Sequence, residues 1–374
     1  MFVYLFLFFT VLSLSLFLGK PKNSSSQYNF CLLFFLLLSS TIAGLRSIGV
    51  GTDTEIYVES YYAATSKLTF IQLFDGSVDL EDYHDKGYLL LSWFSQFLPG
   101  EESALLFSSS FLFLCTTMIA LIKLREIQSV HLFFYFIILF LMFYHQSYNY
   151  MRQFCAIGIL FLGYSYFLRK KYLICFLFLF VAANFHSSSL VILLVPLIYY
   201  FSYNKKTSVK ILFLVFVLFL SFIIVRNFNT ILIYLVSHGF VIDIYGDRYG
   251  ETGDYSGETI TKIYIYMFAV GYGLIVFAKL LKQIKSEDFI YLFSLHSICL
   301  SLYCLTIYSV FLFRLSLYFS FIENWYMALL LSNKKMPIWV KGGYCVVLLY
   351  FWLRYFIIGN ACETFPYKSQ IIGI

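Results

Sequence analysis

One polar stretch, Arg46 to Tyr57, carries residue types that could bind an anionic ligand. It follows a long apolar run and reads Arg-Ser-Ile-Gly-Val-Gly-Thr-Asp-Thr-Glu-Ile-Tyr. Its two glycines allow backbone angles that other residues avoid, so the segment could fold tightly around a ligand. The cation of Arg46, the carboxylate of Asp53 and the phenol of Tyr57 predict a polar binding site. The alternative is an ordinary connecting loop.

Other charged residues lie at the ends of apolar runs or inside them. Arg152 opens one run, His186 separates two, and Arg314 lies inside another with Tyr318 about one helical turn later. Charged groups near hydrocarbon are costly and usually face a cavity with a partner. These residues are therefore candidates for the same site. The alternative is that the arginines reach the lipid headgroups and that the histidine ends a helix.

Two further polar groups each allow two interpretations. Glu323 and His296 could form a proton relay or an inter-helix hydrogen bond, and we favour the hydrogen bond. Arg248 lies in Tyr-Gly-Asp-Arg-Tyr-Gly, which could bind sugar rings between its aromatic side chains. The same six residues could equally form a turn with a surface ion pair.

The composition defines the class of protein. Of the 374 residues, 61% are hydrophobic and 12% are charged, and the mean hydropathy is +0.81. Soluble domains contain about 25% charged residues. The chain is therefore expected to be an all-α polytopic integral membrane protein. We expect one transmembrane domain over residues 1–374 and interpret the opening apolar run as a retained span.

Apolar runs long enough to cross a bilayer predict about twelve spans. They are Phe2–Leu18, Tyr28–Leu45, Ser103–Ile122, Leu132–Ser147, Arg152–Leu168, Tyr172–Phe185, Ser187–Tyr203, Val209–Val225, Ile260–Leu281, Phe289–Val310, Leu312–Leu331 and Ile338–Ile358. With twelve spans, the lysine-rich connections fall on one side, which is then cytoplasmic. Two large loops, 46–102 and 226–259, are then extracytoplasmic. Within the first, Tyr88–Leu98 is too short to span and predicts a re-entrant or interfacial helix.

The two predicted faces differ in their basic residues. Six of the eight arginines fall outside, whereas lysine dominates inside. A topology signal does not distinguish the two residue types, but a phosphate site does, because the planar fork of arginine binds phosphate in two places. The chain has no phosphate-binding Walker sequence, no zinc-protease motif and no Gly-x-Ser-x-Gly. Its eight cysteines have no metal-ligand spacing, so no metal or cofactor is expected.

An ordered set of short motifs carries a family resemblance. The set is Arg46…Gly51-Thr52-Asp53…Tyr57, Asp85-Lys86-Gly87-Tyr88, Arg152-Gln153, Phe185-His186-Ser187-Ser188, Arg314 with Tyr318, and the tail Thr364-Phe365-Pro366-Tyr367. Together these motifs resemble the EpsG family of Wzy-like polysaccharide polymerases, which make surface polysaccharides. The resemblance implies a GT-C-like transmembrane fold in the bacterial cytoplasmic membrane. It also implies an active site on the outer side that joins oligosaccharide units carried on undecaprenyl diphosphate.

The resemblance gives each candidate residue an expected role. Arg46, Arg152 and Arg314 would bind the diphosphate and offset charge on the leaving group. His186 or Asp53 would act as the general base, unless Asp53 instead holds Arg46 in place. His186 is preferred because a neutral imidazole is available at neutral pH. Tyr57, Tyr88, Arg248 and Tyr318 would contact substrate.

The expected partners are the lipid-linked oligosaccharide, as donor and acceptor, and the bilayer. A chain-length regulator is an optional partner, and no nucleic acid is expected. Two other functions stay open. A flippase would bind the same diphosphate without making a bond, and a ligase would transfer a finished chain to a different acceptor.

Overall fold

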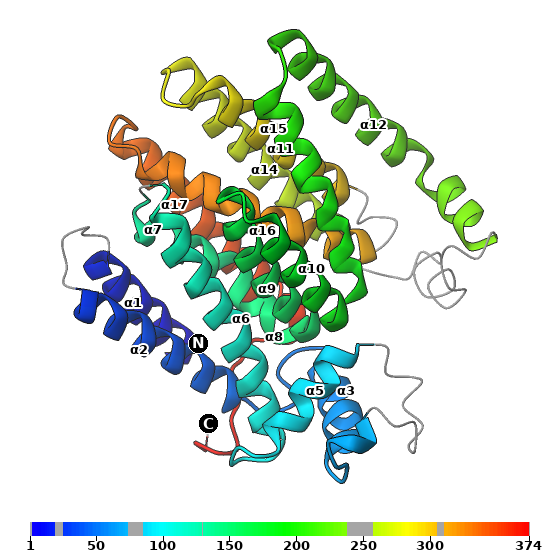
Figure 1. The fold of residues 1–374 in the computed structure, drawn as a ribbon. Helices are drawn as coiled ribbons and strands as arrows, with labels where there is room; N and C mark the ends of the chain where they lie inside the picture. The colour runs from blue at the N-terminus through cyan, green and yellow to red at the C-terminus, as the bar shows by residue number, and fades with distance from the viewer. Residues whose placement is uncertain are drawn as a thin grey trace. The chain divides into compact units, whose positions relative to one another are not determined.

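The structure is a computed structural model, which describes residues 2–18, 25–73, 85–128, 130–237, 257–304 and 310–373. Within these ranges every regular element is a helix and no strand occurs (Figure 1). A helix satisfies its backbone hydrogen bonds within one segment, as an apolar environment requires. The expected all-α class is confirmed.

Several helices have the length and composition of membrane spans. Four segments in the described ranges are long and apolar enough to cross a bilayer. They are Glu102–Arg125, Met151–Leu168, Ser187–Asn204 and Ile338–Ile358. Shorter apolar helices accompany them, and a helix covers all or most of each predicted apolar run. The count of twelve crossings stays a prediction.

The chain forms two compact units, which are described separately. The first unit contains Met1–Leu190 and Leu348–Ile374, and the second contains Val191–Val347. Two helical elements include residues of both units, the 3-10 helix η4 (Ser187–Leu193) and α17 (Ile338–Trp352). The α17 helix is followed by η6 (Leu353–Ile358) and η7 (Ala361–Glu363).

Long helices form the body of the first unit. They are α1 (Phe2–Leu18), α2 (Ser25–Gly44), α6 (Glu102–Arg125), α9 (Met151–Leu168) and α10 (Tyr172–Phe185). The α6 helix packs between α2 and α9, and α9 packs against α10. Glycine permits the close crossings, since a Cβ on Gly44 would lie 2.8 Å from Phe107 Cβ and one on Gly158 would lie 2.7 Å from the Phe113 carbonyl oxygen.

Short helical pieces occupy two other parts of the first unit. Between α2 and α6 lie α3 (Thr54–Tyr57), the π-helical turn η1 (Val58–Tyr62), α4 (Ala63–Thr65), η2 (Ile71–Leu73) and α5 (Lys86–Ser95). Between α6 and α9 lie α7 (Leu132–Ile138), the π-helical turn η3 (Leu139–Tyr144) and α8 (His145–Asn149). The helix predicted over Tyr88–Leu98 corresponds to α5, whose interfacial or re-entrant position stays a prediction. Turns of π-helix are frequent at functional sites.

The second unit is organised around one helix. It contains α11 (Leu194–Asn204), α12 (Thr207–Ser237), α14 (Gly257–Leu280), α15 (Ser286–Cys304) and α16 (Val310–Ser332). The α15 helix packs against the other four. The α12 helix continues beyond the predicted end at Val225, with a non-helical residue at Asn227. The predicted loop over 226–259 therefore begins as helix, and its residues 238–256 lie outside the described ranges.

Candidate functional site

Arg46 follows the end of α2 and is buried, with 2% of its surface exposed. Its Nη1 donates to the Ala43 carbonyl oxygen at 2.8 Å, and its Nη2 donates to that of Tyr148 at 3.0 Å. The guanidinium also stacks on the Tyr148 ring, 4.2 Å from its centroid. The ion pairs of the described residues do not include one between Arg46 and a carboxylate, and the suggestion that Asp53 holds Arg46 in place stays a prediction. Burial lowers the pKa of Arg46.

The last residue of α8, Asn149, anchors the glycine-containing loop. The side-chain oxygen of Asn149 accepts hydrogen bonds from the Thr52 hydroxyl and the Asp53 backbone N–H, both at 2.7 Å. Gly51 has φ +110°, and a Cβ there would lie 2.5 Å from Thr54 Oγ1. The loop therefore requires glycine at this position. It forms a fixed structure rather than a freely connecting segment.

Arg152 begins α9 and is more accessible, with 23% of its side chain exposed. Its Nη1 forms an ion pair with Asp85 and donates to the Tyr61 hydroxyl at 2.7 Å. The guanidinium lies 4.6 Å from the ring centroid of Tyr57 and 5.3 Å from that of Tyr61. Burial raises the pKa of Tyr61 to about 12, although Arg152 acts in the opposite direction. The Tyr61 phenol is therefore neutral near pH 7 and can accept this hydrogen bond.

Tyr88 on α5 connects the two arginines. Its ring is buried and lies 5.1 Å from that of Tyr61, and its hydroxyl lies 4.0 Å from Met151 Sδ. The same sulfur is 3.4 Å from Arg46 Nη2. We call Arg46, Arg152, Asp85 and the tyrosines at 57, 61 and 88 the arginine cluster. Four residues predicted for the site thus lie together: Arg46, Arg152, Tyr57 and Tyr88.

The two predicted bases lie beside this cluster in different ways. Asp53 accepts a long hydrogen bond of 3.4 Å from the hydroxyl of Tyr57. His186 ends α10, and its Nδ1 is 2.7 Å from Ser188 Oγ. It follows Phe185, on which Gly87 of α5 packs so closely that a Cβ would lie 2.8 Å from the ring. Asp53 is therefore linked to Arg152 through one tyrosine, whereas His186 is linked to the start of α5.

The C-terminal tail packs on the same loop. The backbone N–H groups of Ser47, Gly51 and Thr52 donate to carbonyl oxygens of Lys368, Glu363 and Cys362 at 2.8, 3.1 and 3.2 Å, respectively. Thr364 accepts a hydrogen bond from the Tyr4 hydroxyl at its carbonyl oxygen, 2.6 Å away. Its own hydroxyl lies 2.9 Å from His145 Nδ1. The tail thereby fixes the loop that carries Arg46.

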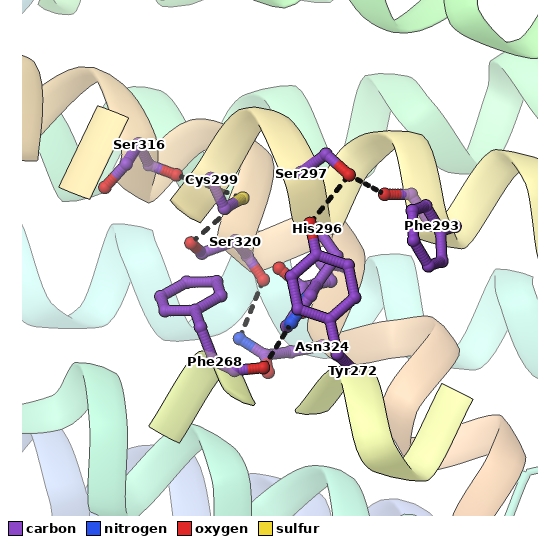
Figure 2. Close-up of polar contacts among 10 residues, drawn as sticks. Phe268, Tyr272, Phe293, His296, Ser297, Cys299, Ser316, Ser320 and Asn324 are labelled. Carbon is purple, nitrogen blue, oxygen red and sulfur yellow. Dashed lines mark hydrogen bonds and ion pairs between the residues drawn. The ribbon is translucent and has the colours of Figure 1, made fainter. Parts of the chain in front are cut away.

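The second unit contains a separate polar cluster (Figure 2). His296 on α15 places Nδ1 2.5 Å from Glu323 Oε1 on α16 and Nε2 2.8 Å from the Phe268 carbonyl oxygen on α14. Tyr272 packs on the imidazole at 4.3 Å and donates to Ser297 Oγ at 2.7 Å. We call these residues the histidine cluster. The predicted inter-helix hydrogen bond is confirmed.

Two of the other predicted site residues belong to the second unit, and one lies outside the described residues. Arg314 and Tyr318 are on α16 of the second unit, where Tyr318 is buried. Arg248 lies outside the described residues. Within the described ranges, no group of three or more His, Cys, Asp or Glu residues could hold a metal ion.

Comparison with known proteins identifies the family. A family model described as the EpsG family matches residues 28–369. The chain belongs to the EpsG family. This is a family of Wzy-like polysaccharide polymerases, so the protein is a membrane protein of polysaccharide biosynthesis with a glycosyltransferase-like activity. No curated protein and no solved structure matches the chain.

In this EpsG-family chain, sequence reasoning missed the roles of two residues in the arginine cluster. Asp85 belongs to one of the quoted motifs but has no predicted role, and Tyr61 lies outside all of these motifs. The spacing of Tyr57 and Tyr61 places both rings on one face of a helical segment, which is a usable signal. The ion pair of Asp85 with Arg152 joins residues 67 positions apart, and nothing local in the sequence indicates it.

Proposed function

We propose that the protein polymerises oligosaccharide repeat units carried on undecaprenyl diphosphate. The bond between the anomeric carbon of the donor and its diphosphate breaks, and a hydroxyl of the next lipid-linked unit forms the new glycosidic bond. The hydroxyl proton goes to a general base, and undecaprenyl diphosphate leaves. The proposal includes a GT-C-like fold with about twelve spans and a site on the outer side of the bacterial cytoplasmic membrane.

One observation carries the assignment of the diphosphate. Arg46 and Arg152 are linked through Met151, Tyr88 and Tyr61. Within the described residues, Asp85 is the one carboxylate in an ion pair with either arginine. A buried cation without a counter-ion is unfavourable unless an anion binds nearby. We assign direct contact with the diphosphate to Arg152, because its side chain is partly exposed. Arg46 contributes its positive charge from the buried side of the site.

The remaining roles follow from the contacts. Asp53 is our preferred base because it reaches Arg152 through Tyr57, and His186 is the alternative. Tyr57 and Tyr88 shape the site around the reacting groups. Arg314, Tyr318 and Arg248 keep their assignments as predictions, the first to the diphosphate and the others to substrate.

The test is product length in membranes reconstituted with one synthetic lipid-linked repeat unit. Wild type should give a ladder of longer products, and Arg152→Ala should not. The matched control is Lys67→Ala, which removes an exposed cation from the same part of the chain. Movement of the substrate across the bilayer without a ladder would contradict polymerisation and support a flippase. Transfer of a finished chain to a different acceptor would support a ligase.

A further inference from the structure

We propose that Asp85 is an internal anion that occupies Arg152 until a substrate diphosphate replaces it. This inference rests on the proposed function, because it concerns the ligand of Arg152. Asp85 is then a positioning residue that controls access to the site and takes part in no covalent step.

Arg152 has a hydrogen-bond donor that neither Asp85 nor Tyr61 uses, so an anion with more oxygen atoms could form more hydrogen bonds with it. Asp85 Oδ2 and the Tyr61 hydroxyl both contact the same nitrogen, Nη1. The Nε atom of Arg152 is buried and has no hydrogen-bond partner among the described residues. A guanidinium binds phosphate best through two parallel hydrogen bonds. The pair with Asp85 therefore uses only part of what Arg152 offers.

Contacts hold the backbone from Asp85 onward, so a side-chain rotation is sufficient for the exchange. The Asp85 carbonyl oxygen accepts hydrogen bonds from the backbone N–H groups of Tyr88 and Leu89 at 3.0 and 3.1 Å. Gly87 packs against Asn184 and Phe185 with no space for a Cβ. These contacts hold the start of α5 while the carboxylate turns away. Opening the site therefore does not require α5 to unfold.

Charge favours the exchange. Asp85 offers one negative charge, whereas a diphosphate carries a negative charge on each phosphate and can reach two guanidinium nitrogens. The aromatic rings of Tyr57 and Tyr61 cover part of the Arg152 guanidinium, which strengthens its interactions with anions. Without ligand, Asp85 keeps this partly buried guanidinium neutralised. After product leaves, the same carboxylate can return to Arg152.

The decisive experiment measures inorganic diphosphate binding to the purified full-length protein by calorimetry. Asp85→Asn keeps the shape of the side chain but removes the competing charge, so diphosphate should bind on the order of tenfold more tightly. That factor corresponds to an Arg152 that is available about one tenth of the time in wild type. Asp85→Ser is a second neutral variant in case the first folds poorly. Glu55→Gln, which removes an exposed carboxylate on α3, is the matched control and should bind as wild type does.

A double-mutant cycle tests whether the effect acts through Arg152. In an Arg152→Gln background, Asp85→Asn should leave diphosphate binding unchanged. In the polymerisation assay, Asp85→Asn should lower KM without raising kcat. A loss of kcat with unchanged diphosphate binding would instead make Asp85 the base and overturn the inference.

Failure of the inference and failure of the proposed function give different results. If wild type binds diphosphate and the neutral variants bind it no more tightly, only the exchange is wrong. If neither wild type nor any variant binds diphosphate, the diphosphate site itself is wrong, and the inference falls with it.

Discussion

The arginine cluster and the histidine cluster are both buried polar groups between helices, but their charges are balanced differently. In the histidine cluster, one imidazole faces one carboxylate, with side-chain exposures of 3% and 6%. Because Nε2 of His296 donates to the Phe268 carbonyl oxygen, one proton is shared between Nδ1 and Glu323. The pair is neutral overall, and its partners are all within the protein. The arginine cluster instead has two guanidiniums and one paired carboxylate.

In an apolar protein, we expect a polar cluster with balanced charges to be structural and a cluster with excess charge to bind a ligand. Burying charge is costly wherever it occurs, so a balanced pair is stable without any ligand. An unbalanced cluster is stabilised by an anion from outside. We therefore expect changes in the histidine cluster to alter stability and changes in the arginine cluster to alter activity.

The largest expected effect is on stability in the histidine cluster. His296→Leu leaves the Glu323 carboxylate buried without its partner, and we expect a loss of about 3–5 kcal/mol. The double variant His296→Leu/Glu323→Met should recover most of this loss, because it removes both charges. Unfolding measured in detergent checks both values. A double variant that folds but does not polymerise would show that this cluster takes part in the reaction.

The second-largest expected effect is a loss of activity when Arg152 of the arginine cluster is replaced. Arg152→Ala should reduce kcat/KM by about 10²–10³, as expected for the loss of one group that stabilises a charged leaving group. Arg152→Lys should recover only part of the activity, because lysine lacks the planar fork. Glycan synthesis from lipid-linked substrate, with folding checked in parallel, measures this. Full activity of Arg152→Ala would contradict its assignment to the diphosphate.

Two glycine substitutions, one beside each cluster, form a paired test. Each should lower the free energy of unfolding by about 1–3 kcal/mol. Gly271→Ala would place a Cβ 2.5 Å from His296 Cε1, and Gly51→Ala would place one 2.5 Å from Thr54 Oγ1. We expect Gly271→Ala to lower the thermal midpoint while the folded protein keeps its activity. Gly51→Ala should also lower kcat/KM, because it displaces the loop next to Arg46. Equal effects on activity would remove the distinction between the clusters.

The smallest effect concerns the ion pair between the buried Lys210 and the partly exposed Glu287, which lies outside both clusters. Backbone hydrogen bonds at the start of α15, and then Lys210, hold the pKa of Glu287 below its ordinary value. A carboxylate whose pKa is lowered by folding stabilises the folded state at pH values above its unfolded-state pKa. This contribution is lost as the pH falls through its folded-state pKa. Glu287→Gln should cost less than about 1 kcal/mol at pH 7, since the carboxylate is 40% exposed. Unfolding at decreasing pH should show the difference begin to shrink as the pH falls below the ordinary glutamate pKa of about 4.3.

Hydropathy and charge predicted the helices best where basic residues end an apolar run. The predicted spans Arg152–Leu168 and Tyr172–Phe185 correspond to α9 and α10 within one residue, because three basic residues separate them. The run Leu132–Ser147 was predicted as one span but contains the π-helical turn η3. A change in hydrogen-bond register alters no hydropathy value, so the sequence pattern could not indicate it.

Sequence motifs predicted four of the six residues of the arginine cluster, and long-range geometry added Asp85 and Tyr61. Arginine at the end of an apolar run is unusual enough to mark Arg46 and Arg152. The partner of each could not be read from the sequence, since Asp53 is near Arg46 in the chain but Asp85 pairs with Arg152 instead. Such pairings depend on how α5 and α9 pack.

The hydrogen bonds of the C-terminal tail have a consequence for biosynthesis. The loop that carries Arg46 is held by carbonyl oxygens of Cys362, Glu363 and Lys368. During translation these residues leave the ribosome after all the long helices have been made. The loop that carries Arg46 can therefore take its final form only after α17 and the tail that follows it have been made. We expect a nascent chain that ends before Cys362 to lack an ordered arginine cluster, even when all of its long helices have formed.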